Sequence, residues 1–159
     1  MPANTSVNTS AGCTLSVVAA GAAPATFDAT GFAAQTWVPV GEVTDLGEFG
    51  REYNLVTHNP VGNRSRQKFK GSFNEGQMDI KLGLQTDDAG QIIMKAAVLS
   101  DLSFSFRVVM QNLDVYYMRA QCMKWKVGVG SVDQITAASA TLEITTNNAG
   151  VGIVEALAV

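Results

Sequence analysis

The chain has 159 residues, of which 47% are hydrophobic and 16% charged, and its formal net charge is −3 at pH 7. This length suits one domain with a core of its own. The acidic balance excludes bulk electrostatic attraction to nucleic acid as the main activity. No run approaches the roughly 20 apolar residues of a membrane-spanning helix, so no membrane partner is expected.

The charged fraction is low for a soluble domain, in which about 25% of residues are usually charged. Since charged residues are depleted at the centres of interfaces, we expect neighbouring chains to cover much of the surface. The two cysteines, Cys13 and Cys122, form no metal-type or redox-type pair, and we expect both to be reduced and partly buried. A disulfide between them is the alternative, which a reducing cytoplasm would disfavour.

The first half of the chain begins with small polar residues. We expect a flexible arm over 1–11 and a single domain over 12–159. Apolar residues alternate over 36–43 and predict a strand, which Pro39 places at a sheet edge or at a strand start. Residues 44–63 are rich in Gly, Asp, Glu and Asn, which predicts a long loop outside the core.

Two alternating runs follow, 64–73 and 77–85, and the short Asn74-Glu75-Gly76 turn between them predicts a hairpin. Polar residues of the second run, Asp79 and Lys81, oppose its apolar face. On the first run, four basic residues share one face: Arg64, Arg66, Lys68 and Lys70.

Residues 91–99 break the period-two pattern, because apolar residues recur there four positions apart. The spacing predicts one helix of about three turns. Thr86 or Asp87 can cap its free amides, and Asp87 and Asp88 suit the positive end of its dipole.

Strands return after the helix. Residues 102–110 alternate cleanly, and a second, long strand is predicted over 115–127. It changes phase at Cys122 and Met123, which indicates a β-bulge or a strand that changes its packing partner midway.

The last two predicted strands cover 139–146 and 151–159. The second is almost entirely apolar, so we expect it to be central in a sheet or buried by another chain. Together the elements predict a mainly β fold, an antiparallel β-sandwich or barrel with one flanking α-helix.

No catalytic, cofactor-binding or metal site is predicted, and we expect no enzyme. His58, the only histidine, lies in the predicted loop without a positioned partner and is interpreted as an exposed loop residue. An acidic stretch does not have the spacing of a calcium-binding loop and is interpreted as a solvated or partner-facing patch. Its members are Glu42, Asp45, Glu48 and Glu52.

The basic row at 64–70 has three interpretations: a nucleic-acid stripe, an inter-subunit contact, or a solvated strand face. Because the acidic stretch at 42–52 has the complementary charge, we hypothesise that the basic row of one subunit meets the acidic stretch of the next.

Several motifs over about 31–146 resemble the major tail proteins of bacteriophages with long, non-contractile tails (siphophages). The first runs from Trp37 to Gly47, with Gly50 and Glu52-Tyr53 behind it. The others are Lys68-Phe69-Lys70-Gly71-Ser72, Asn74-x-Gly76, Asp88-x-Gly90-Gln91, Phe104-Ser105-Phe106, Tyr116-Tyr117-Met118 and the Gly128-Ser131-Asp133 segment.

The resemblance implies a tail tube fold and a homo-oligomer of stacked hexameric rings, which binds other tail proteins and conducts double-stranded DNA into the host. It implies a place in the virion tail, assembly in the host bacterial cytoplasm and no cofactor. Residues 44–63 would then reach an adjacent ring. Either Arg64, Lys68 and Lys70 or Asp79 and Lys81 would face the lumen.

Two alternatives stay open. A ring-forming tube protein of a contractile secretion system would share the fold and the hexamer. A β-sandwich carbohydrate-binding module would use aromatic residues at strand spacing: Trp37, Trp125, Tyr116 and Tyr117.

Overall fold

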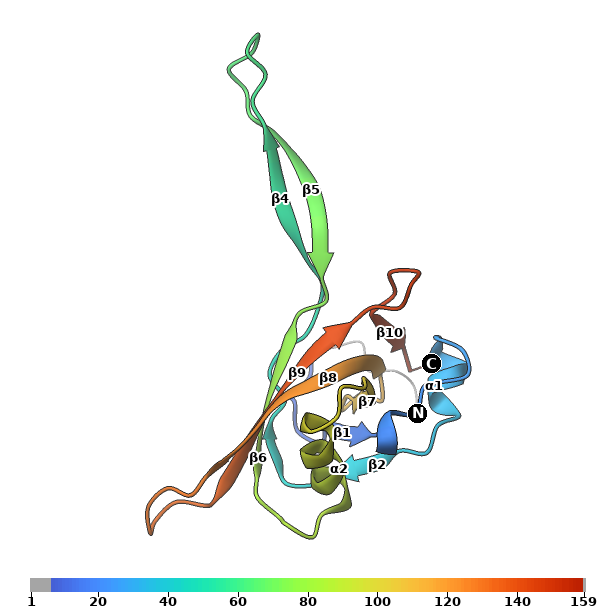
Figure 1. The fold of residues 1–159 in the computed structure, drawn as a ribbon, viewed down its shortest axis with the longest axis vertical. Coiled ribbons are helices and arrows are strands. Elements are labelled where there is room, and N and C mark those ends of the chain that lie inside the picture. The colour runs from blue at the N-terminus through green and yellow to red at the C-terminus, as the bar shows by residue number, and fades with distance from the viewer. Residues whose placement is uncertain (1–6, 159) are drawn as a thin grey trace.

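Ten strands and three helical segments make up residues 7–158, the part of the chain that the computed structural model describes (Figure 1). The strands are β1 (Thr14–Val17), β2 (Val38–Val40), β3 (Val43–Asp45), β4 (Glu52–His58), β5 (Gln67–Asn74), β6 (Gln77–Gly83), β7 (Phe104–Val109), β8 (Val115–Gly128), β9 (Ala137–Thr145) and β10 (Ile153–Ala156). The helices are α1 (Ala29–Ala33), α2 (Ala89–Val98) and the 3-10 turn η1 (Ala19–Gly21).

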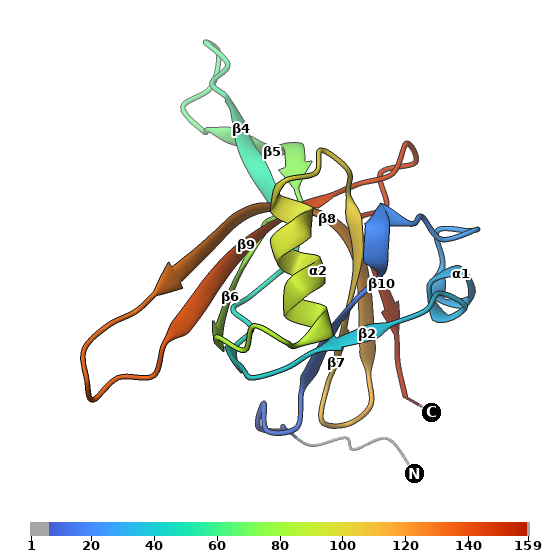
Figure 2. The ribbon, with the colours of Figure 1, turned by 60° about the horizontal axis from the view of Figure 1, so that its bottom comes forward.

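Eight strands form one antiparallel sheet in the order β2-β1-β7-β8-β9-β6-β3, with β10 pairing β8 beside this path. The sheet curls around a core, and α2 packs along it (Figure 2). The predicted class, mainly β and antiparallel with one main helix, is confirmed. Among the described residues, no helix has the length and apolar character needed to span a membrane.

The long strand β8 joins the two halves of this sheet. Its first half pairs with β7 and β10, and its second half pairs with β9. The register moves from Cys122 opposite Leu142 to Lys124 opposite Thr141, so Met123 is the extra residue of a bulge. The predicted phase change at this point is confirmed.

The core consists of the apolar sides of alternating strands. Met78, Ile80 and Leu82 of β6 have exposed fractions of 1% or less, and Met94 of α2 is fully buried against the sheet. Burial of each such side chain stabilises the fold by about 1.5–3 kcal/mol. Cys122 is also buried, and desolvation raises the pKa of its thiol to about 11. Cys122 and the half-buried Cys13 are both free thiols, as predicted.

Helix α2 begins two residues before the predicted start, and Asp88 caps it in place of Thr86 or Asp87. The Asp88 carboxylate accepts a hydrogen bond from the Gln91 backbone N–H at 3.0 Å. Gly90 explains why the helix starts here: a Cβ atom on it would lie 2.3 Å from the Pro39 carbonyl oxygen of β2. Tertiary packing against the edge strand therefore selects the cap.

A short helix that the sequence did not predict, α1, packs beside β10 and over Tyr117 of β8. Asp28 caps α1 by accepting from the Gly31 N–H at 2.7 Å, and the fully buried Phe32 stacks on Tyr117 with ring centroids 5.4 Å apart. Trp37 packs against the same tyrosine and donates its indole N–H to the Phe32 carbonyl oxygen at 2.9 Å. These aromatic rings form a second small core.

The predicted hairpin of 64–73 with 77–85 is wrong. Strand β5 pairs with β4, and β6 pairs with β9 and β3. Glu75 is buried, and Gly76 has a positive φ of 90°, so the chain passes from β5 into β6 without folding back. The predicted loop 44–63 does leave the core, but it contains strand β4.

The terminal segments also differ from the predictions. Strand β10 is shorter than the predicted 151–159 and pairs only with β8, so it is a partly buried edge strand and not a central one. Residues 7–11 of the predicted flexible arm contain no helix or strand. The rest of that prediction, residues 1–6, lies outside the described residues, as does residue 159. Pro39 lies in the edge strand β2, as expected.

Candidate assembly surfaces

Strands β4 and β5 form a two-stranded arm, residues 52–74, that projects from the body along the longest axis of the molecule (Figure 1). Each face of the arm carries one apolar pair, Val56 with Phe69 on one face and Tyr53 with Phe73 on the other, because a β-bulge shifts the register between the two pairs. Val56 and Phe69 are 49% and 55% exposed. A two-stranded ribbon is only marginally stable in water, so this uncovered face indicates a contact outside the chain.

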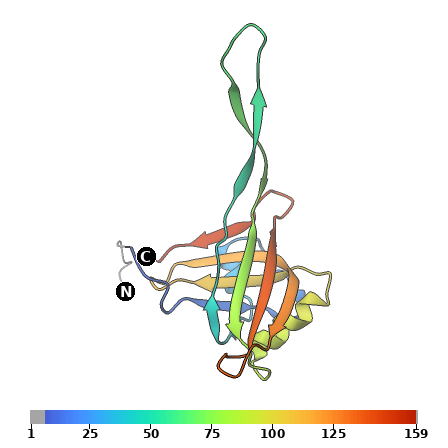
Figure 3. The ribbon, with the colours of Figure 1, turned by 90° about the vertical axis from the view of Figure 1, so that its left-hand side faces the viewer.

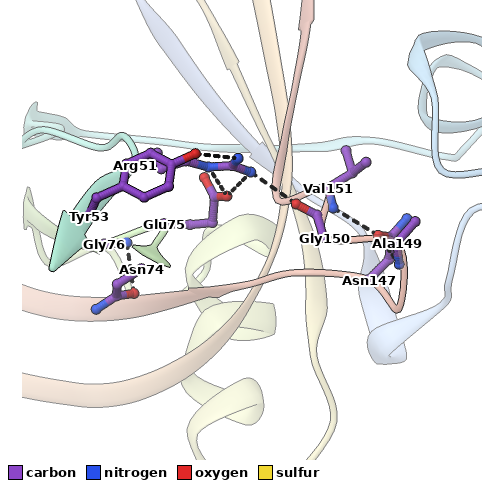
Figure 4. A network of polar contacts seen from close by, with 9 residues as sticks. All are labelled: Arg51, Tyr53, Asn74, Glu75, Gly76, Asn147, Ala149, Gly150 and Val151. Atoms are coloured by element: carbon purple, nitrogen blue, oxygen red, sulfur yellow. Dashed lines mark hydrogen bonds and ion pairs between the residues drawn. The ribbon is translucent and has the colours of Figure 1, made fainter. Parts of the chain in front are cut away.

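The base of the arm is held by a cluster around Arg51 (Figure 4). The Arg51 guanidinium donates to the buried Glu75 carboxylate, with a distance of 2.8 Å from Nε to Oε1, and to the Gly150 carbonyl oxygen at 2.9 Å. Its Cζ atom also lies 3.9 Å from the ring centroid of Phe73. Hydrogen bonds to Tyr53 and to Glu75 raise the pKa of Arg51. The cluster thus ties the arm to the loop between β9 and β10.

The sequence did not point to this cluster, because its members are far apart in the chain and each has an ordinary role locally. Packing explains why position 152, beside this cluster, is a glycine: a Cβ atom there would lie 2.3 Å from Cγ of Glu75. Glu75, which the sequence suggested was a turn residue, is only 3% exposed.

The basic row lies on the arm but does not form one strand face. Lys68 and Lys70 belong to β5 and alternate with Phe69, whereas Arg64 and Arg66 lie in the loop at the tip, before β5 starts. All four side chains are exposed. The ammonium group of Lys70 reaches to 4.9 Å from the ring centroid of Tyr53.

The acidic stretch lies where the chain passes from the body to the arm. Glu42 precedes β3 with a φ of 59°, Asp45 ends β3, Glu48 lies in the following loop and Glu52 begins β4. All four are exposed. Among residues 7–158, Arg51–Glu75 is the one ion pair, so the structure does not bring the acidic stretch and the basic row together within one chain.

Strands β6, β9 and the second half of β8 lie side by side in one layer of the body (Figure 3). Asp79 and Lys81 are exposed on the polar outer face of this layer. The Asp79 carboxylate accepts from the Thr141 hydroxyl at 2.8 Å, and this bond, with a second from Gln77, lowers the pKa of Asp79. Charges of both signs share the face, which is otherwise polar and uncharged. They belong to Asp79, Lys81, Lys124, Lys126 and Glu143.

This polar-faced sheet has two unpaired edges. Strand β3 pairs only with β6, and residues 121–128 of β8 pair only with β9, because β7 pairs no further than Ala120. Unpaired edges are templates for strand addition by another chain.

An apolar groove is lined by α2 and by the hairpin formed by β8 and β9. The loop before α2 and this hairpin lie at the end of the body away from the arm (Figure 1). Its volume is about 240 Å³. Ile92 of α2 and Val127 of β8 are half-exposed at this groove, and Trp125 is partly buried. The other lining residues are Leu84, Gln85, Thr86, Gln91 and Lys95.

His58 is exposed at the end of β4, close to the arm tip. Within the described part of the chain, no group of three or more His, Cys, Asp or Glu residues is placed to hold a metal ion.

The aromatic residues of the carbohydrate-binding alternative do not gather on one surface. Tyr117 is 6% exposed and is covered by Phe32 and Trp37. Tyr116 contacts Phe49 instead, and Trp125 lies at the groove.

No family model and no curated protein matches the sequence. Solved structures do match over nearly the whole chain. A chain of the sixfold-symmetrised baseplate of the anti-feeding prophage has a TM-score of 0.69 at 9% identity, with 90% of this chain and 95% of that chain covered. A chain of the sheath/tube terminator of the PVC extracellular contractile injection system has a TM-score of 0.61 at 10% identity, with 96% and 99% covered.

The SPP1 tail tube is also similar, with a TM-score of 0.63 at 14% identity, covering 92% of this chain and 77% of that chain. At these identities the likeness establishes the fold: this chain has the fold found in phage tail tubes and in contractile injection systems.

Proposed function

We propose that this protein is a structural subunit of a bacteriophage tail tube, which forms stacked hexameric rings and catalyses no reaction. The observation that carries the proposal is the shared fold with the SPP1 tail tube over nearly the whole chain. The uncovered arm and the two open sheet edges support it, because both need contacts that one chain does not provide.

The rings close through the edges of the polar-faced sheet. Strand β3 of one subunit pairs with residues 121–128 of β8 in the next, a head-to-tail contact that ends when the ring closes. The polar face with Asp79 and Lys81 then lines the lumen. Its charges of both signs, set among hydroxyl groups, suit the passage of double-stranded DNA without specific binding.

Stacking adds the charge contact expected from the sequence, in which the basic row of one subunit meets the acidic stretch of another. Charge reversal with Lys68→Glu and Lys70→Glu should weaken assembly, most at low salt. Unchanged assembly of this variant across a salt series would contradict the proposed contact between the basic row and the acidic stretch.

The tube belongs to the virion tail, is assembled in the host cytoplasm and binds other tail proteins. The second candidate is the tube protein of a contractile system. The likenesses to the anti-feeding prophage and to the contractile injection system favour it. The genes that flank this one distinguish the two, since a sheath gene would accompany a contractile tube.

Negative-stain electron microscopy of the concentrated, purified protein tests the proposal. We expect rings or hollow tubes of uniform diameter with sixfold end views. Single subunits across a range of salt and protein concentrations would contradict self-assembly of the chain alone, and would make sugar binding worth measuring.

A further inference from the structure

The outer half of the arm has an apolar surface that its own chain leaves open. Val56 and Phe69 lie on one face at paired positions. Gly71 leaves space beside Val56 on this face, because a Cβ atom at position 71 would lie only 2.8 Å from a methyl group of Val56. Arg51 covers Phe73 on the opposite face near the base, whereas Phe69 is 55% exposed.

The charge of the arm indicates what covers this surface. Residues 52–74 contain four basic residues and one acidic residue, a formal charge of +3. The whole chain has 11 basic and 14 acidic residues, so the remainder carries 7 basic and 13 acidic residues, a formal charge of −6. Pairing of two arms would bring like charges together, whereas an arm on the body of a second copy joins opposite charges.

The apolar groove is the surface of the body that matches the arm in apolar character and position, while the opposite charge belongs to the body as a whole and not to the lining of the groove. Trp125, Ile92 and Val127 give it an apolar lining, and Asp87 follows the lining residue Thr86. Lys95 is the single charged residue in the lining. In Figure 1 the loop between β6 and α2 and the β8–β9 hairpin lie at the end of the molecule opposite the arm.

We propose that the apolar face of the arm, with Phe69 at its centre, binds in the groove between α2 and the β8–β9 hairpin of a second copy of this chain. The inference rests on the proposed tube function and names the residues through which one copy stacks on the next. Because the two surfaces differ and lie at opposite ends, the contact is head-to-tail and repeats without closing.

Site-specific photo-crosslinking tests the contact directly. The full-length protein carries the photoreactive residue p-benzoylphenylalanine in place of Phe69 and is irradiated at an assembling concentration. We expect a covalent dimer whose crosslinked peptides map to residues 84–98 or 123–128. The matched control carries the same group in place of Lys68, on the other face of β5, and should not label these segments.

Crosslinks from position 69 to another arm, to the acidic stretch or to any surface outside the groove would overturn the inference. Electron microscopy of the same sample separates this failure from that of the function. Rings or tubes with crosslinks elsewhere, or with none, contradict the groove contact only. Single particles without crosslinks contradict both.

Two surface variants provide a second test. Phe69→Ser removes the apolar ring from the contact surface of the arm, and Ile92→Lys places a positive charge in the groove. Each variant alone should therefore fail to form tubes. In a mixture of the two proteins, the Ile92→Lys variant supplies an intact arm and the Phe69→Ser variant supplies an intact groove. One ring can then stack on one other ring but no further, so we expect paired rings and no tubes. The matched control Leu99→Lys, at the exposed end of the same helix, should assemble normally. Normal tubes from Ile92→Lys would overturn the inference.

Discussion

The sheet of the body and the arm follow the same sequence pattern, but only one of them buries its apolar face. In β6, the alternating Met78, Ile80 and Leu82 are closed off from solvent by the rest of the chain. In the arm, the equivalent apolar positions Val56 and Phe69 remain about half exposed. Period-two alternation therefore indicates that one face of a strand needs cover, and it does not indicate whether the same chain supplies it.

The largest expected effect is in the body. Phe106→Ala removes a fully buried ring from β7 and should lower the free energy of unfolding by about 3–5 kcal/mol. Denaturant-induced unfolding of dilute protein measures this change. A loss below about 1 kcal/mol would mean that the body is not the stable part of the molecule.

The junction between the two regions should show an intermediate effect. Glu75→Ala removes the buried acceptor of the Arg51 guanidinium, and the loss of this charged hydrogen bond should cost about 1.5–3 kcal/mol. Hydrogen exchange of the β4 and β5 amides should also accelerate. Glu75→Gln, which keeps the shape and one acceptor oxygen, serves as the control and should have a smaller effect on both measurements.

A smaller effect is expected at the start of α2. Asp88→Ala removes the helix cap and should lower stability by about 1 kcal/mol. The neighbouring exposed Asp87 is the matched control, and Asp87→Ala should change stability by less than about 0.5 kcal/mol. Equal effects of the two substitutions in thermal unfolding would contradict the assignment of the cap to Asp88.

The smallest effect on the free subunit is expected in the arm. Phe69→Ala should leave the free energy of unfolding within about 0.5 kcal/mol of the unsubstituted value, because the ring packs on little of its own chain. The same variant should be impaired in assembly, as measured by sedimentation at high concentration. A large loss of stability together with normal assembly would reverse the roles assigned to the body and the arm.

Local features of the fold were predictable from the sequence. The bulge of β8 follows from a phase change at Cys122 and Met123 that the alternation itself contains. The edge position of β2 follows from Pro39, which lacks the N–H that a central strand would need. In both cases, neighbouring residues carry all the information.

Features that depend on distant contacts were not predictable. The predicted pairing partner of β5 was wrong. The direction of the chain after β5 depends on the burial of Glu75 beneath Arg51 and on the left-handed backbone of Gly76. The five-residue helix α1 was missed, since a run of Ala, Thr and Gly around Phe32 has no helical periodicity. At the candidate surfaces, the exposed charges were found from sequence, but the groove and the arm-base cluster combine segments far apart in the chain.

Hydrogen exchange of the arm in the free and the assembled protein tests directly whether a second copy covers the arm. We expect the amides of β4 and β5 to exchange rapidly in dilute subunits and to become protected in sedimented assemblies, while those of β6 and β9 are protected in both. Equal exchange of the arm in the two states would contradict the claim that another copy covers it.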